Sequence, residues 1–139
     1  MSKIKIINKF ILSIIIISLA FFLIGCAGQK VEKISIDEVK DYADAAAERI
    51  FIGISKEDYN LFSEDFDEQM ISALTEQKFK EIVKQLGKYE SKEIIGADRV
   101  QGYTRVHYKT KFSKISREVL FTVVFSEADE MKVSGLFYK

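Results

Sequence analysis

The spacing of apolar residues changes near residue 88, and this change constrains the fold more than any other feature of the sequence. Before that point apolar side chains recur every three or four residues, as in amphipathic helices. Beyond it they alternate, as in strands with one buried face. Helices followed by a run of antiparallel strands are typical of an α+β fold, in which the helices pack across the apolar face of the sheet. We therefore expect N-terminal helices packed on a curved, four-stranded antiparallel meander.

The first helix is expected to begin at Ser35, because Ser35 and Glu38 have the spacing of a capping box. It runs to about Ile52, and Gly53 ends it. Its apolar stripe consists of Val39, Tyr42, Ala43, Ala46 and Ile50.

Three shorter helices are expected to follow. Ser55 with Asp58 begins the second, the third starts after Asp65, and Thr75 caps a fourth that ends at Gly87. Their apolar residues are Tyr59, Phe62, Phe66, Met70, Leu74, Phe79, Ile82, Val83 and Leu86.

The alternating part of the sequence predicts strands at about 88–95, 103–112, 116–125 and 131–138. In the hairpin between the second and third strands, the expected pairs are Val106 with Phe121, Tyr108 with Val119, His107 with Leu120, and Lys109 with Glu118. In the last hairpin they are Val123 with Val133 and Val119 with Phe137. These registers gather the apolar residues on one face and leave His107 on the outward face.

The first 25 residues differ from the rest of the chain. They carry Lys3, Lys5 and Lys9, no acidic residue, and an apolar run of 15 residues from Phe10 to Ile24. A charged start followed by a short apolar stretch is typical of a secretory signal, and a membrane-spanning helix needs about 20 apolar residues. We therefore expect a signal peptide at 1–25, a tether at 26–35 and the α+β domain at 36–139.

The end of this segment, Leu23-Ile24-Gly25-Cys26, resembles the bacterial lipobox. The resemblance implies cleavage between Gly25 and Cys26 and attachment of a diacylglyceryl group to the Cys26 thiol. Cys26 is the one cysteine of the chain, so an intramolecular disulfide is excluded. The expected location is the outer side of the cell membrane, with the lipid as anchor.

The charge balance argues against nucleic acid as a partner. The whole chain has 21 basic and 21 acidic residues, and without the three N-terminal lysines the balance is 18 to 21. A net charge near −3 does not provide the basic surface that binding to phosphates requires.

Neither a metal site nor a cofactor motif is expected. The chain has a single His and a single Cys, and the acidic stretch 63–68 lacks the turn glycine of a calcium loop. A phosphate loop and a nucleophile elbow are both absent from the sequence.

The chain resembles a known family over about residues 38–138. The residues that carry the likeness are Phe66, Met70, Leu74-Thr75, Leu86-Gly87-Lys88-Tyr89 and Gly135-Leu136-Phe137-Tyr138. It is similar to domain-of-unknown-function family 3887, found on lipoproteins, within the nuclear transport factor two-like, or cystatin-like, superfamily. The resemblance implies a cone-shaped fold and brings no catalytic residues with it.

Some relatives of that fold are isomerases and dehydratases, with an Asp or an Asp/His pair inside the cone. In this chain the expected register turns His107 outward, and the inward strand positions offer no carboxylate. General acid–base catalysis needs such a group within reach of the substrate. We therefore assign no catalytic residue.

Two other sets of residues are candidates for function. Arg117 is expected near Thr110, Tyr108 and Tyr42, where a guanidinium at the mouth of an apolar cone could hold a carboxylate or a phosphate. The alternative is that Arg117 extends into water. The outward face of the sheet also carries apolar residues, which suggest an interface for a second copy or another protein. These residues are Leu120, Leu136, Val124, Tyr103 and Tyr138.

The function expected from the sequence is therefore a non-catalytic, membrane-anchored domain that binds a small ligand or a protein. The alternative is a small-molecule lyase or isomerase that uses the cone cavity.

Overall fold

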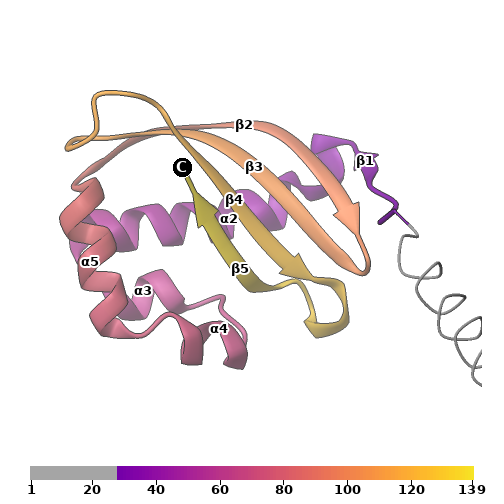
Figure 1. Ribbon diagram of the computed structural model, residues 1–139, viewed down its shortest axis with the longest axis horizontal. Coiled ribbons are helices and arrows are strands. Elements are labelled where there is room, and N and C mark those ends of the chain that lie inside the picture. The colour runs from indigo at the N-terminus through magenta and orange to yellow at the C-terminus, as the bar shows by residue number, and fades with distance from the viewer. Residues whose placement is uncertain (1–27) are drawn as a thin grey trace, which may run out of the picture.

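In the computed structural model, which describes residues 28–139, four helices accompany a five-stranded antiparallel sheet (Figure 1). The helices are α2 (Ile36–Lys56), α3 (Tyr59–Ser63), α4 (Glu68–Ala73) and α5 (Glu76–Leu86), and a 3₁₀ turn spans Glu127–Asp129. The strands are β1 (Glu32–Ile34), β2 (Tyr89–Val100), β3 (Tyr103–Phe112), β4 (Val119–Ser126) and β5 (Lys132–Tyr138). They lie in this order across the sheet. The expected α+β class is confirmed, but the sheet has five strands where four were expected.

Each helix begins at a side-chain cap. Ser35 accepts a hydrogen bond from the backbone N–H of Asp37 at 3.3 Å, and Thr75 accepts one from that of Lys78 at 3.5 Å. Asp58 and Asp67 cap α3 and α4 in the same way. Such caps satisfy backbone donors that have no partner within the helix. The predicted starts of α2 and α5 are confirmed, and α4 begins two residues later than expected.

Gly53 does not end the first helix, as the sequence suggested. Helix α2 continues to Lys56 and is closed by Glu57 in a left-handed conformation, with φ of 59°. A Cβ atom on Gly53 would lie 2.6 Å from the backbone nitrogen of Phe62, so this glycine allows α3 to approach α2 closely. Ser55 is likewise part of α2, and its hydroxyl accepts a hydrogen bond from the Tyr89 N–H.

Strand β1 lies within the predicted tether. Its residues pair with Ala97–Arg99, in a part of β2 that extends beyond the predicted strand end at residue 95. A bulge at Ile95 interrupts the alternation, so that Ile94 and Ala97 both face inward. Because the bulge breaks the alternation of apolar and polar residues, the second half of β2 could not be recognised as strand from the sequence pattern.

The hairpin of β3 and β4 has a different register from the one expected. Val106 lies opposite Val123, and His107 opposite Thr122. The pairing is offset by two residues because residues 113–118 form a longer connection than a two-residue turn. An offset of two preserves the faces, so His107 points outward as predicted. Lys109 also contacts Glu118, with Nζ and Oε2 3.7 Å apart.

The last strand departs from the expected facing. A bulge at Ser134 lets Val133 oppose Phe125 and then shifts the pairing, so that Leu136 opposes Val123. As a result Leu136 and Tyr138 pack against the core, whereas Phe137 points outward and is 63% exposed. The sequence had placed Phe137 on the inner face and Leu136 and Tyr138 on the outer one, and that part was wrong.

The core lies between α2 and the sheet and is rich in aromatic rings. Phe51 of α2 is fully buried, and its ring lies 5.0 to 6.0 Å from those of Tyr108, Phe112 and Phe121. Each such buried side chain contributes about 1.5–3 kcal/mol. Aromatic side chains therefore pack closely between α2 and the inner face of the sheet.

Candidate binding site

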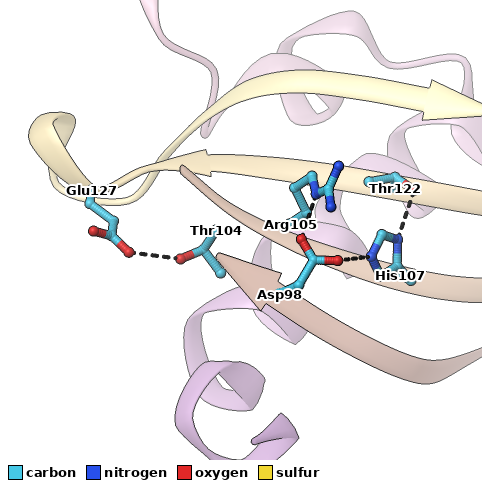
Figure 2. Close-up of polar contacts among 6 residues, drawn as sticks. All are labelled: Asp98, Thr104, Arg105, His107, Thr122 and Glu127. Atoms are coloured by element: carbon cyan, nitrogen blue, oxygen red, sulfur yellow. Dashed lines mark hydrogen bonds and ion pairs between the residues drawn. The ribbon is translucent and has the colours of Figure 1, made fainter. Parts of the chain in front are cut away.

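Four polar side chains, Arg105, Asp98, His107 and Thr122, form a hydrogen-bonded row across the outer face of the sheet (Figure 2). His107 on β3 lies at its centre. Its Nε2 is 3.0 Å from Oδ2 of Asp98 on β2, and its Nδ1 is 2.9 Å from Oγ1 of Thr122 on β4. Arg105 donates from Nε to the other oxygen of Asp98. The strand pairing brings these residues together, because His107 is directly opposite Thr122 and Asp98 is directly opposite Arg105.

Hydrogen bonds within the row keep Asp98 ionised. Burial raises the pKa of Asp98, but hydrogen bonds from Arg105 and His107 outweigh this effect and hold the pKa below its usual value. The carboxylate is therefore ionised at neutral pH and accepts the Nε2–H of His107. In the neutral ring, Nδ1 then accepts the hydroxyl proton of Thr122. Both ring nitrogens have a defined partner, so the imidazole has a fixed orientation.

An open hollow of about 470 Å³ lies beside this row. Its exposed apolar lining includes Ile95, Leu120 and Phe137, which are 46%, 39% and 63% exposed. Its polar lining consists of His107, Thr122 and Lys139, and the aromatic residues Tyr108, Phe121 and Tyr138 complete it. The bulge at Ile95 and the bulge in β5 turn two of these apolar side chains outward. Apolar walls with a few fixed polar groups are typical of small-molecule sites, and 470 Å³ falls within their usual range of about 300–1,000 Å³.

The predicted ligand pocket is not assembled. Thr110 is buried and donates its hydroxyl hydrogen to the Val119 carbonyl at 2.8 Å, while Arg117 is exposed within the β3–β4 connection. Tyr108 is buried with its hydroxyl 3.2 Å from Asp44, and burial, chiefly, raises the pKa of this phenol. Tyr42 packs edge-on against Phe125. The alternative, in which Arg117 extends into water, fits the structure.

The predicted interface is divided between the two faces of the sheet. Leu120, Val124 and Tyr103 point outward as expected. Leu136 and Tyr138 face the helices, and the Tyr138 hydroxyl donates to Oε1 of Gln85 at 2.9 Å. Ile95 and Phe137 contribute to the outer surface in their place.

Asp98 is the important residue that the sequence reasoning missed. The predicted strand ended at residue 95, so the acid was never paired with His107. Gly96 inside a run of alternating residues was the available signal, because a glycine within a strand often marks a bulge.

Within residues 28–139, no group of three or more His, Cys, Asp or Glu side chains is placed to hold a metal ion. Among the helices described for the same residues, none combines the length and the apolar character needed to cross a membrane.

Comparisons with known proteins identify the family. No curated protein and no solved structure matches the chain. Residues 47–136, which include α3, α4, α5, β2, β3, β4 and most of β5, match the model of a family described as "Protein of unknown function (DUF3887)". This match covers well over half of the sequence and every residue of the polar row, and the chain therefore belongs to the DUF3887 family.

Proposed function

We propose that this chain is a lipid-anchored, extracytoplasmic domain that binds a small, largely apolar ligand in the hollow on the outer face of its sheet. The observation that carries the proposal is the grouping of three exposed apolar side chains, Ile95, Leu120 and Phe137, around a fixed imidazole. Exposed apolar surface is costly in water, and its concentration at one concave place favours a bound partner.

The polar wall of the hollow defines the chemistry of the ligand. Because His107 is held by Asp98 and Thr122, it can contact a ligand without an additional cost of ordering its ring. Both ring nitrogens of His107 already have partners, so the ring offers a ligand its flat face, and the Thr122 hydroxyl oxygen retains a lone pair that can accept a hydrogen bond. A ligand with an apolar body and one hydrogen-bond donor matches this lining.

The anchor is proposed from the sequence. Cys26 follows a lipobox-like segment, and the first strand begins at Glu32, so five residues separate the two. Fully extended, five residues span about 17 Å. The domain would therefore lie close to the membrane surface, with its β1 edge nearest the anchor.

We also propose that the fold is the nuclear transport factor two-like cone. Support comes from the long helix α2, which lies along the sheet and contributes Phe51 to its buried aromatic cluster (Figure 1). An experimental structure that showed a flat sheet with no concave face would contradict this assignment.

The ligand site can be tested by NMR on isotope-labelled full chain in detergent micelles, screened against a library of small aromatic and aliphatic fragments. Fragments that bind should shift the resonances of His107, Thr122 and Leu120. Phe137→Ser should weaken their binding at least tenfold. Tyr103→Ser is the matched control, because Tyr103 is an exposed aromatic residue near the same face but outside the hollow. Fragments that shift none of these resonances, or that bind both variants equally, would contradict the proposal.

The second candidate function is a lyase or isomerase, now favoured by one specific observation, the contact of His107 with Asp98. A carboxylate beside an imidazole can support general base catalysis. Both ring nitrogens are already occupied, however, and strand β4, which carries Thr122, pairs with a neighbouring strand on each side, so its backbone donors are used. Few donors are therefore available to stabilise a developing negative charge. Conversion of a bound fragment by the wild-type chain, lost in His107→Asn, would favour this alternative over binding alone.

Self-association through the outer face is a further proposal, based on Tyr103, Leu120, Val124 and Phe137. A dimer that covers this face would also close the hollow. Light scattering at high micromolar concentration distinguishes the two arrangements, because a monomer there contradicts the dimer and leaves the hollow open to a small ligand.

A further inference from the structure

Strand β5 forms one edge of the sheet, and the chain itself uses part of that edge. The N–H of Val133 donates to the Asp65 carbonyl at 2.7 Å, and the N–H of Asp67 donates to the Val133 carbonyl at 2.9 Å. Phe66 thereby forms a one-residue parallel bridge with Val133. After this bridge the chain turns away into α4, so the added strand stops after one residue.

The edge continues beyond Val133 without a neighbour among the described residues. Lys139 and Leu120 exchange both of their backbone hydrogen bonds, each of 3.1 Å. In an antiparallel ladder the direction of the backbone groups alternates, so Phe137 also points its groups toward β4. The N–H and C=O groups of Leu136 and Tyr138 therefore point away from the sheet, in the direction that Val133 uses to bind residues 65 and 67.

A groove of about 500 Å³ runs along this edge, between β5 and the helices α4 and α5. Its apolar lining consists of Met70, Leu74, Ile82, Leu136 and Tyr138.

We propose that this groove binds an extended segment of a partner polypeptide, which adds to β5 as a sixth strand. The bridge at Phe66 shows how a neighbouring strand sits at this edge, and Leu136 and Tyr138 provide the next donors and acceptors along it. Such strand addition obtains affinity from main-chain hydrogen bonds and specificity from pockets for alternate side chains. The partner segment has about five residues, with apolar side chains at the alternate positions that face Ile82 and Leu74. This groove adjoins the hollow over His107, because Phe137 and Tyr138 line both, but Ile82, Leu74 and Met70 line the groove alone.

The test selects linear twelve-residue peptides from a random phage-displayed library against the full chain in detergent micelles. Selected peptides are then synthesised and measured by calorimetry. Binding should slow hydrogen exchange at the amides of Leu136 and Tyr138. It should be lost when alternate peptide nitrogens are methylated, because methylation removes the donors that pair with β5.

Two variants of the chain examine the two parts of the groove. Leu136→Pro removes an outward-pointing N–H, a change that edge strands tolerate, and Ile82→Gln places an amide in the apolar wall. Each should weaken peptide binding at least tenfold. Lys80→Gln is the matched control, because it introduces the same side chain on α5 about 200° around the helix from Ile82 and outside the groove.

Several outcomes would overturn the proposal. One is a library that yields no binding sequence, and another is a set of peptides that bind Ile82→Gln as tightly as Lys80→Gln. The proposal would also be overturned if peptide binding slowed hydrogen exchange at other amides but not at those of Leu136 and Tyr138. A dimer that Leu136→Pro dissociates would assign the edge to a second copy of the chain and not to a partner peptide.

Discussion

His107 Nε2 lies 3.0 Å from Oδ2 of Asp98. This contact depends on the bulge at Ile95, because strict alternation along β2 from Ile94 would place Asp98 on the inner face. The bulge inserts one residue into β2 and so brings Asp98 to the outward face beside β3. With Thr122 on the other side of the ring, the contact fixes the orientation of this surface histidine at the proposed site.

Asp98 should stabilise the fold in a way that depends on pH. The hydrogen bonds from Arg105 and His107 hold its folded-state pKa below the unfolded value of about 3.9. A depressed carboxyl pKa gives stability that is fully present above the unfolded value and is lost as the pH falls through the folded value. Asp98→Asn should therefore lower the free energy of unfolding by about 1–2 kcal/mol at pH 7.

Urea denaturation from pH 7 down to pH 2 measures this effect. The difference between wild type and Asp98→Asn should shrink below about pH 4. Asp41→Asn, at an exposed position of α2, is the control and should change stability little. An unchanged difference at pH 2 would show that the charge of Asp98 does not contribute.

Several tyrosines should make the fold sensitive to alkali. Burial beside Glu48 raises the pKa of Tyr89 to about 12, and burial also raises those of Tyr42, Tyr108 and Tyr138. Above about pH 10 the unfolded chain loses phenolic protons that the folded chain retains, so stability falls as the pH rises.

Absorbance at 295 nm during a titration follows ionisation of the phenols, and circular dichroism follows unfolding. Tyr108, with its hydroxyl against Asp44, should ionise only when the domain unfolds, so Tyr108→Phe should remove amplitude from the step that coincides with unfolding. Loss of amplitude from an earlier step would contradict the buried position of this side chain.

The sequence was informative where local chemistry decides the structure. Thr75 and Gly87 delimit α5 because a cap and a glycine with φ of 78° act within one turn of the chain. The inward and outward faces of β3 followed from alternation alone, and a register offset of two residues does not change them. The DUF3887 membership predicted from short motifs was also correct.

The parts that could not be predicted depend on irregular or distant contacts. The bulges at Ile95 and Ser134 each reverse the face of the sheet to which the following residues point. For this reason the sequence analysis placed Phe137 on the wrong face and did not pair Asp98 with His107. Strand β1 has only three residues and exists because β2 is long enough to pair with it. Arg117 was placed by parity in a strand that in fact begins at Val119.

Gly53→Ala should destabilise the domain, although alanine favours helices over glycine by about 1 kcal/mol. The new Cβ would lie 2.6 Å from the backbone nitrogen of Phe62 and 2.7 Å from its Cα, and backbone atoms cannot move aside as a flexible side chain can. We expect a net loss of about 1–3 kcal/mol in the free energy of unfolding.

Urea denaturation of Gly53→Ala and Gly28→Ala makes the comparison. A Cβ on Gly28 meets no atom within 4 Å, so that variant should behave as wild type. Equal stability of the two variants would mean that α3 can move away from α2 without cost.

Cys26→Ser should release the chain from the membrane, because the proposed anchor is a diacylglyceryl group on this thiol. Each buried methylene contributes about 0.8 kcal/mol, so two acyl chains give a durable anchor, and a serine cannot carry the thioether. The lipobox resemblance also implies that cleavage depends on this cysteine, so the variant should accumulate as a longer precursor.

Fractionation of cells followed by mass spectrometry measures both effects. Gly28→Ser, two residues further along, is the control and should remain processed and membrane-bound. A Cys26→Ser chain that is still processed and still sediments with membranes would show that the attachment has another origin.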